Sequence, residues 1–266
     1  MNEAKKKYGQ NFLTDKNLLQ KIVKDSFLDN KTVIEVGPGR GALTEYICQY
    51  AKKVIAFEID SDLKQYLDKL EQKHENLKIT YQDFLKVDLN TIKIKENLDQ
   101  EVILIGNLPY YITTPILFKF IETPFLKQAT IMIQKEVAER ISSKPNLKTY
   151  NALSVIVQYQ AEVKKIMNVS RKLFSPVPKV DSIVLNILKK ENIDNAFLNL
   201  FTTFVKASFT QKRKTLINNL HDFFNIPKTV IEEFLIKNGF EPNARAEQLS
   251  ITDFERLTKE WSNLLK

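Results

Sequence analysis

The chain has 266 residues, and its 40 lysine and arginine residues exceed its 32 aspartate and glutamate residues, which gives a formal net charge of +8. A basic chain of this length suits a polyanionic partner such as a nucleic acid, and its 43% apolar content is enough for one large α/β domain with a smaller appendage. One cysteine and two histidines exclude an internal disulfide and argue against a zinc site, so we expect no metal.

The amino-terminal segment 1–13 begins with a basic cluster formed by Lys5, Lys6 and Lys7. An aromatic residue, a glycine and two amides follow this cluster. The spacing leaves two interpretations open, a frayed terminus and a basic arm that folds over a ligand. Asp15 then offers a capping side chain to an amphipathic helix that we expect to run to about Phe27. No apolar run reaches the length of a signal peptide or a membrane span, so we expect a cytoplasmic protein.

A glycine-rich loop follows the first expected strand, residues 32–36. Its sequence is Gly37-Pro38-Gly39-Arg40-Gly41, and a helical pattern follows it. Strand, glycine loop and helix form the geometry of a nucleotide-binding turn, in which glycine lets a ligand approach the amino end of the helix. The G-x-G-x-G spacing differs from the G-x-G-x-x-G fingerprint, which favours a ligand with a ribose and no pyrophosphate. A structural tight turn is the alternative.

Three further expected strands each end on a polar side chain. The strands span residues 53–57, 77–81 and 101–106, and the polar residues after them are Glu58, Asp83 and Asn107. Such side chains would line one edge of a parallel sheet, where ligands bind in open α/β folds. Glu58 lies about twenty residues beyond the glycines, where a carboxylate can accept hydrogen bonds from both hydroxyls of a ribose. Asp60 is expected to cap the next helix instead.

The residues around Asp83 and Asn107 suit flat ligands. Asp83 can accept from an amine, and Phe84 can offer its ring and backbone N–H to the same ligand, although a turn aspartate beside a core phenylalanine is the alternative. In the stretch Asn107-Leu108-Pro109-Tyr110-Tyr111, Gly106 lets the backbone leave its strand closely packed and Pro109 stiffens the loop. An amide and a ring at a strand end can grip a nucleobase; an ordinary turn is the alternative.

The next elements are a helix at 115–121, a strand at 129–133, helices from 134 and at 150–158, and strand-like segments at 162–169 and 182–188. A connector with prolines at alternate positions, 176 and 178, joins the last two segments and is held extended. It presents Phe174 among the cations Arg171, Lys172 and Lys179. An aromatic ring among cations suits an unpaired base, and a core phenylalanine is an equal alternative.

Strand patterns end at about residue 190, so we predict an α/β domain at 1–190 and a small all-helical domain at 191–266. Helices are expected at 194–207, 211–221, 227–238 and 252–264. Lys212, Arg213 and Lys214 would lie at a helix start, where they could bind phosphates or form a solvated basic face. The first domain is predicted to hold a parallel sheet of the open α/β type.

Over nearly its whole length the sequence resembles the ribosomal RNA adenine N6,N6-dimethyltransferase family. The resemblance rests on the residue stretches 9–13, 35–44, 58–60, 83–84, 107–110, 174–182 and 245–250. The first five stretches also resemble the macrolide-resistance methyltransferases of large-subunit RNA, whereas the last two favour the enzymes of small-subunit RNA. One departure is Tyr111, where the family usually carries asparagine.

The resemblance implies a Rossmann-like class I methyltransferase sheet, mostly parallel with one antiparallel strand near the carboxyl-terminal end of the domain. It also implies S-adenosylmethionine as methyl donor and a set of residue roles. Gln10, Asn11 and Leu13 would cover the methionine end of the donor, and Gly37, Gly39 and Gly41 would let the backbone approach it. Glu58 would bind the ribose, and Asp83 and Phe84 would bind the adenine. Asn107, which would also border the donor, would hold the target adenosine together with Leu108, Tyr110 and Phe174. RNA would meet the basic residues Lys5, Lys6, Lys7, Arg171, Lys172, Lys179, Lys212, Arg213 and Lys214.

The activity that the resemblance implies is dimethylation of the N6 amines of two adjacent adenosines near the 3′ end of small-subunit (16S) ribosomal RNA. The expected partner is that RNA within a pre-ribosomal particle, and the expected form is a monomer. The alternatives are a large-subunit RNA methyltransferase and a non-catalytic ribosome assembly factor. A nicotinamide-dependent oxidoreductase is disfavoured by the glycine spacing.

Overall fold

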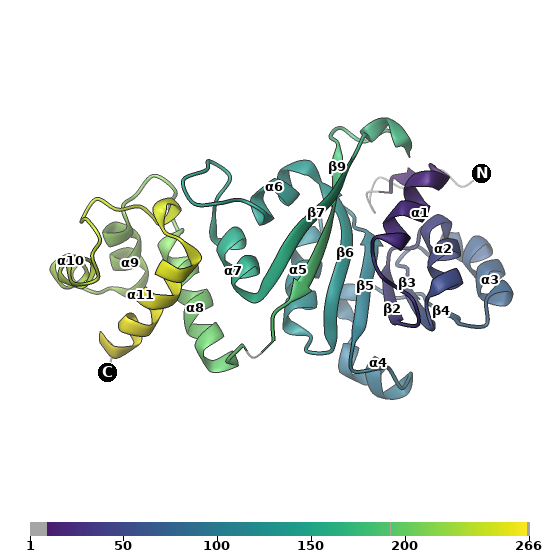
Figure 1. Ribbon diagram of the computed structural model, residues 1–266, viewed down its shortest axis with the longest axis horizontal. Helices are drawn as coiled ribbons and strands as arrows, with labels where there is room; N and C mark the ends of the chain where they lie inside the picture. Colours follow the sequence, from purple (N-terminus) through teal and green to yellow (C-terminus); the bar gives the residue numbers. More distant parts are fainter. Residues whose placement is uncertain (1–9, 192, 265–266) are drawn as a thin grey trace. The chain divides into compact units, whose positions relative to one another are not determined.

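The computed structural model describes residues 10–191 and 193–264, so the predicted basic cluster Lys5, Lys6 and Lys7 lies outside the described residues. The chain divides into two compact units, whose elements are labelled in Figure 1. The first unit comprises the described residues up to 138 together with 163–189, and the second comprises the described residues of 139–162 and 190–266. The division into domains 1–190 and 191–266 stays a prediction.

The first unit is built on a seven-stranded sheet. Its strands, in spatial order, are β4 (Leu77–Thr80), β3 (Lys53–Phe57), β2 (Thr32–Val36), β5 (Val102–Asn107), β6 (Leu126–Gln134), β9 (Ser182–Lys189) and β7 (Ala161–Val169). The strands from β4 to β6 are parallel to their neighbours, and β9 runs antiparallel to β6. The predicted sheet, mostly parallel with one antiparallel strand, is confirmed.

The central strands are apolar because both of their faces are buried. All five residues of β2 are buried, and the side chains of β5 are buried up to Gly106. Such continuous apolar runs are typical of parallel strands with two covered faces, whereas a half-exposed strand would alternate. On one face the core contains residues of α1 (Lys16–Lys24), α2 (Ala42–Tyr50) and α3 (Lys64–Lys73).

The remaining helices of the first unit are α4 (Leu89–Lys95), α5 (Thr113–Glu122) and α6 (Lys135–Ile141), the last of which continues into the second unit. α1 begins at the predicted cap, since the Asp15 side chain accepts from the Leu18 N–H at 2.8 Å. It ends at Lys24 rather than near Phe27, whose φ of 53° is not helical. The polar sequence of α4 carries little apolar periodicity, so this helix was not predicted.

The second unit contains α7 (Ala152–Gln160), α8 (Asn195–Ser208), α9 (Leu216–Phe224), α10 (Lys228–Lys237) and α11 (Ile251–Leu264). Trp261 of α11 packs against the rings of Phe204, Phe224 and Phe234, with ring centroids 5.1 to 5.5 Å away. The predicted helix start at 211 was wrong. The side chain of Asn219 donates to the Ser208 and Gln211 carbonyls and accepts from the Gln211 N–H. These bonds hold a turn before α9.

None of the helices in residues 10–191 and 193–264 combines the length and the apolarity that crossing a membrane requires.

Candidate functional site

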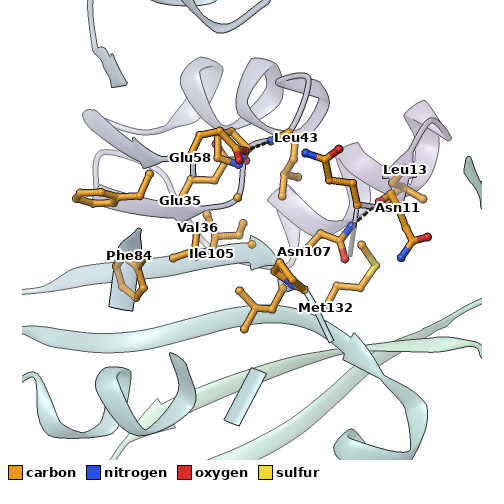
Figure 2. Close-up of a pocket in the computed structure, with 18 of the residues that line it drawn as sticks. Asn11, Leu13, Glu35, Val36, Leu43, Glu58, Phe84, Ile105, Asn107 and Met132 are labelled. Atoms are coloured by element: carbon orange, nitrogen blue, oxygen red, sulfur yellow. Dashed lines mark hydrogen bonds between the residues drawn. The ribbon is translucent and has the colours of Figure 1, made fainter. Parts of the chain in front are cut away.

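A cavity of about 360 Å³ lies where β2, β3 and β5 of the first unit end. Figure 2 shows it as an elongated space with Phe84 at one end and Asn11 and Leu13 at the other. The predicted donor and target residues that line it are Gln10, Asn11, Leu13, Gly37, Gly39, Glu58, Asp83, Phe84, Asn107, Leu108 and Tyr110. Gly41 and Phe174 are not among the lining residues. The ligand roles of all of these residues stay predictions.

Two glycines in the strand-end loops beside the cavity allow backbone arrangements that a side chain would prevent. Gly39 has a φ of +62°, which L side chains rarely adopt, and its N–H donates to Oε2 of Glu58 at 3.0 Å. At Gly106, an added Cβ would lie 2.4 Å from the carbonyl oxygen of Val36 in the neighbouring strand. The close approach predicted for Gly106 is confirmed, because only glycine lets β5 leave the sheet this near to β2.

Glu58 is held by backbone donors. Besides the bond from Gly39, its Oε1 accepts from the Asp60 N–H at 2.9 Å. Burial raises the pKa of Glu58, and the backbone N–H groups of Asp60 and Gly39 partly offset this effect. Asp60 caps the following short helix by accepting from Asp62, as predicted, and also accepts from the Gln10 amide at 2.7 Å. The amino-terminal segment is therefore tied to the strand end that carries Glu58.

The opposite end of the cavity is formed by Asp83 and Phe84. Asp83 Oδ1 accepts from the Leu85 N–H at 3.0 Å, which closes a short 3-10 helix, and the Phe84 ring lies 5.5 Å from the Phe57 ring. Lys119 of α5 donates to the carbonyls of Leu85, at 3.0 Å, and Val87. Its Nζ also lies 5.2 Å from the centroid of the Phe84 ring. This lysine had no role in the sequence-based prediction, and its bonds hold the loop that carries Phe84.

Replacing Lys119 with methionine should weaken donor binding about 5- to 10-fold, because two carbonyls lose a charged donor and the Phe84 loop loosens. Isothermal titration with S-adenosylmethionine measures this change, and kcat at saturating donor should stay near the wild-type value. The charge-matched control is Lys127→Met, which removes a lysine whose side chain is exposed on β6. Equal donor affinity of the Lys119 variant and the wild type would contradict this role.

Glu35 is a site residue that the sequence analysis did not single out. It is 1% exposed on β2 and lines the cavity, and its Oε2 has no hydrogen-bond partner among the described residues. Burial raises its pKa to about 8; the nearby Thr44 hydroxyl lowers it in part, and the charge of Glu58 raises it further. The sequence did contain a signal for this site residue, because Glu35 is a carboxylate inside an otherwise apolar strand. Carboxylates are rarely buried unless they are paired or functional.

The loop after β5 has its amide held in one orientation. Asn107 Nδ2 donates to the backbone carbonyl of Asn11 at 3.0 Å (Figure 2). Because a carbonyl can only accept, this contact identifies the nitrogen end of the amide and directs Oδ1 elsewhere as an acceptor. The Leu108 N–H donates to Met132 at 3.0 Å, so β6 holds the beginning of the loop.

The amino-terminal segment also pairs with the proline-rich connector. β1 (Phe12–Leu13) and β8 (Phe174–Ser175) form an antiparallel pair in which Leu13 lies opposite Phe174. Phe174 is 3% exposed and belongs to the hydrophobic core, so the structure places its ring inside the protein. The connector cations Arg171, Lys172 and Lys179 are exposed.

In the second unit, the predicted phosphate-binding residues lie in the turn before α9. Lys212 and Arg213 are exposed, while Lys214 forms an ion pair with Asp222 at 2.8 Å. Lys212 Nζ donates to the carbonyl of Lys148 at 2.9 Å. Two of the three cations therefore face solvent without a carboxylate partner among the described residues.

The cavity fits the predicted donor, S-adenosylmethionine, in shape and charge. It is elongated, and it offers an aromatic ring at one end and amides at the other (Figure 2). Oε2 of Glu35 has no partner among the described residues, and a bound ligand with positive charge, such as the sulfonium or amino group of this donor, would lower the raised pKa of this carboxyl and favour its ionised form. The described residues contain no group of three or more side chains that could hold a metal ion.

Comparisons with known proteins identify the family of the chain. A model of the family described as ribosomal RNA adenine dimethylase matches residues 1–263. A relative from Onion yellows phytoplasma (strain OY-M), named ribosomal RNA small subunit methyltransferase A, is 52% identical over 261 residues, which cover 97% of this chain and 96% of the relative. A protein of the same name from Streptococcus thermophilus (strain ATCC BAA-491 / LMD-9) is 44% identical over 263 residues, covering 96% of this chain and 90% of that protein.

Solved structures show the same fold. A dimethyladenosine transferase from Plasmodium falciparum superposes with a TM-score of 0.78 at 27% identity, covering 95% of this chain and 98% of that one. The 23S rRNA methyltransferase ErmE superposes with a TM-score of 0.73 at 26% identity, covering 95% of this chain and all of the other, 100%.

Proposed function

Because the chain belongs to the ribosomal RNA adenine dimethylase family, we propose that it dimethylates the N6 amines of two adjacent adenosines near the 3′ end of small-subunit ribosomal RNA. The observation that carries the proposal is one cavity that contains both Glu58 and the loop from Asn107 to Tyr110. Relatives named for small-subunit ribosomal RNA, which match this chain along almost its whole length, support this substrate over large-subunit RNA.

The residues of the cavity would bind the donor by its parts. S-adenosylmethionine supplies a methyl group that its sulfonium has already activated. Glu58 would accept from the ribose hydroxyls, because each of its oxygens has a lone pair beyond the one that a backbone N–H uses. Phe84 and Asp83 would bind the adenine, and Gln10, Asn11 and Leu13 would cover the methionine end.

Asn107 and Leu108 would hold the target amine. The lone pair of an adenine amine is delocalised into the ring, which makes this amine a poor nucleophile. If the amine donates to Asn107 Oδ1 and to the Leu108 carbonyl, its lone pair is directed toward the methyl group. The Asn11 contact supports this step, because it leaves Oδ1 as the acceptor. Catalysis is then mainly positioning, with no proton relay required.

Tyr110 would stack on the flipped base. Stacking contributes about 1 to 3 kcal/mol per base, which offsets part of the free-energy cost of unstacking the base from the RNA. Phe174 is proposed for the other face of the base. Since its ring is 3% exposed, this second contact would require β8 to move away from the core.

Incubation with labelled S-adenosylmethionine tests the function. Unmethylated small-subunit particles and large-subunit RNA are offered separately, and we expect label in small-subunit RNA as N6,N6-dimethyladenosine. Label in large-subunit RNA alone would overturn the substrate, and label in neither would support a non-catalytic assembly role. We further propose that the protein is a monomer and binds the pre-ribosomal particle in the cytoplasm. Light scattering of the purified protein measures its molar mass and tests the monomeric state.

We propose that the helical residues 191–266 bind RNA through the turn before α9. Removing the charges of Lys212, Arg213 and Lys214 together should weaken RNA binding more at low salt than at high salt, because each lost phosphate contact lowers the salt slope by about 1. Lys214 should contribute least, since Asp222 already neutralises it. Binding is measured by filter retention across a salt series.

The charge-matched control removes Lys64, Lys69 and Lys73 from α3. This change should leave the salt slope near the wild-type value. A loss of binding in the turn variant that is the same at every salt concentration would contradict the phosphate role and indicate misfolding.

A further inference from the structure

The backbone around Tyr110 is fixed by a tight turn. The Ile112 N–H donates to the Pro109 carbonyl at 3.1 Å, and the Thr113 hydroxyl donates to the same oxygen at 3.2 Å. Tyr110 therefore occupies a constrained position in the turn, close to where α5 begins. These bonds place the Cα of the residue, but they do not fix the rotation of its side chain, which has two free torsions.

A second element holds the far end of the ring. The Tyr110 hydroxyl lies 3.2 Å from Oγ of Ser182, within hydrogen-bonding distance, and 72 residues separate the two in the chain. The Tyr110 side chain is partly buried, and burial raises its pKa, so the phenol stays protonated and can donate at neutral pH. The ring is therefore held at its backbone end and at its hydroxyl end.

Ser182 itself is rigidly placed. It is the first residue of β9, it is 0% exposed, and it lies opposite Gln134 in the antiparallel pair of β6 and β9. The preceding Asp181 accepts the Lys135 N–H through its backbone carbonyl at 3.0 Å. A serine at this position presents its hydroxyl from a paired strand of the sheet rather than from a loop.

The same serine ends the basic connector. Asp181 Oδ1 accepts from the Arg171 N–H at 2.9 Å, and the Arg171 guanidinium donates to the Lys179 carbonyl at 3.0 Å. The connector is thus closed on itself immediately before Ser182. Its exposed cations are proposed RNA contacts, so the segment that would meet RNA adjoins the hydroxyl that holds the stacking ring.

We propose that Ser182 is a positioning residue for methyl transfer, which holds the Tyr110 ring in the orientation that stacks on the target adenine. The proposal rests on the proposed function, because it assigns the stacking role to Tyr110. It separates two parts of that role: the ring provides the stacking surface, and the bond to Ser182 holds the far end of the ring in place.

A double-mutant cycle tests the proposal. Ser182→Ala should lower kcat about 2- to 10-fold, as expected for the loss of one hydrogen bond, with little change in donor affinity. Tyr110→Phe, which keeps the ring and removes the hydroxyl, should have the same effect. The double variant should be no slower than either single one, because both changes remove the same bond. Ser182→Thr, which keeps the hydroxyl, should restore most of the turnover.

The matched control is Ser26→Ala, which removes another fully buried serine hydroxyl of the first unit, bonded to the Ile22 carbonyl. Its effect should be equal in the wild-type and Tyr110→Phe backgrounds. If the Ser182→Ala and Tyr110→Phe effects multiply in the double variant, Ser182 acts through the fold and the proposal is wrong.

A readout without catalysis separates this proposal from the proposed function. In protein with ¹³C-labelled tyrosine rings, the Tyr110 signal is assigned by its loss in Tyr110→Phe. Ser182→Ala should shift and broaden this signal and leave those of the other tyrosines unchanged. An unchanged Tyr110 signal would overturn the proposal even in a fully active enzyme. If the wild type methylates no small-subunit RNA while the signal still responds, the proposed substrate fails instead.

Discussion

Asn107→Ala should lower kcat for methyl transfer about 100- to 1000-fold, the range found when a single oriented polar group at a reacting centre is removed. The variant loses the Oδ1 acceptor that would direct the lone pair of the adenine amine. Single-turnover assays at saturating S-adenosylmethionine measure this loss. Donor affinity, measured by titration, should fall less than about 10-fold, because only the Asn107 contact to Asn11 is lost on that side of the cavity.

Asn107→Asp is the matched variant that separates the two ends of the amide. It keeps an acceptor oxygen but loses the Nδ2 that donates to Asn11. We therefore expect it to retain more of kcat than the alanine variant and to lose as much donor affinity or more, since a carboxylate next to a carbonyl is repulsive. Unchanged turnover in Asn107→Ala would refute the lone-pair argument.

Glu35→Gln should stabilise the protein without donor, by up to about 5 kcal/mol above pH 8, because glutamine removes a carboxyl whose ionisation is costly in the core. The pKa of Glu35 is raised from 4.5 to about 8 in the folded protein. Below pH 4.5 this carboxyl is protonated in both folded and unfolded chains and costs nothing. Between pH 4.5 and 8 the unfolded chain releases the proton first, so the wild type loses stability as the pH rises.

Urea unfolding at pH 5 and at pH 8.5 measures this difference. The advantage of Glu35→Gln over the wild type should be small at pH 5 and near its maximum at pH 8.5. The control is Glu101→Gln, an exposed carboxylate paired with Lys31, whose effect should stay within about 0.5 kcal/mol at both pH values. An equal advantage of Glu35→Gln at both pH values would show that its ionisation does not affect stability.

The fold could be predicted from the sequence because its signals are local. Apolar runs between turn residues marked the central strands, and helical periodicity marked most of the helices. The errors have local causes as well. α4 has too little apolar periodicity to stand out, and α9 starts later than predicted because the side chain of Asn219 stabilises the turn before it.

The site was predictable only in part. Polar residues at strand ends converge because parallel strands share an edge, so the cavity containing Glu58, Asp83 and Asn107 follows from their order in the chain. The contacts of Lys119 with the Phe84 loop and of Ser182 with Tyr110 join residues that are far apart in sequence. No periodicity reports such pairs. The burial of Phe174 likewise depends on its pairing with β1, which two short segments do not reveal.

The pairing of β1 with β8 has a consequence for the order in which the protein is made. Leu13 meets Phe174 only after the ribosome has synthesised the 160 intervening residues, so the contact has a very large loop to close. The parallel strands β2 to β5 can pair before that point. A nascent chain can therefore pair its parallel strands while β1 still lacks its partner β8, and the contact between Tyr110 and Ser182 forms only after residue 182 has emerged.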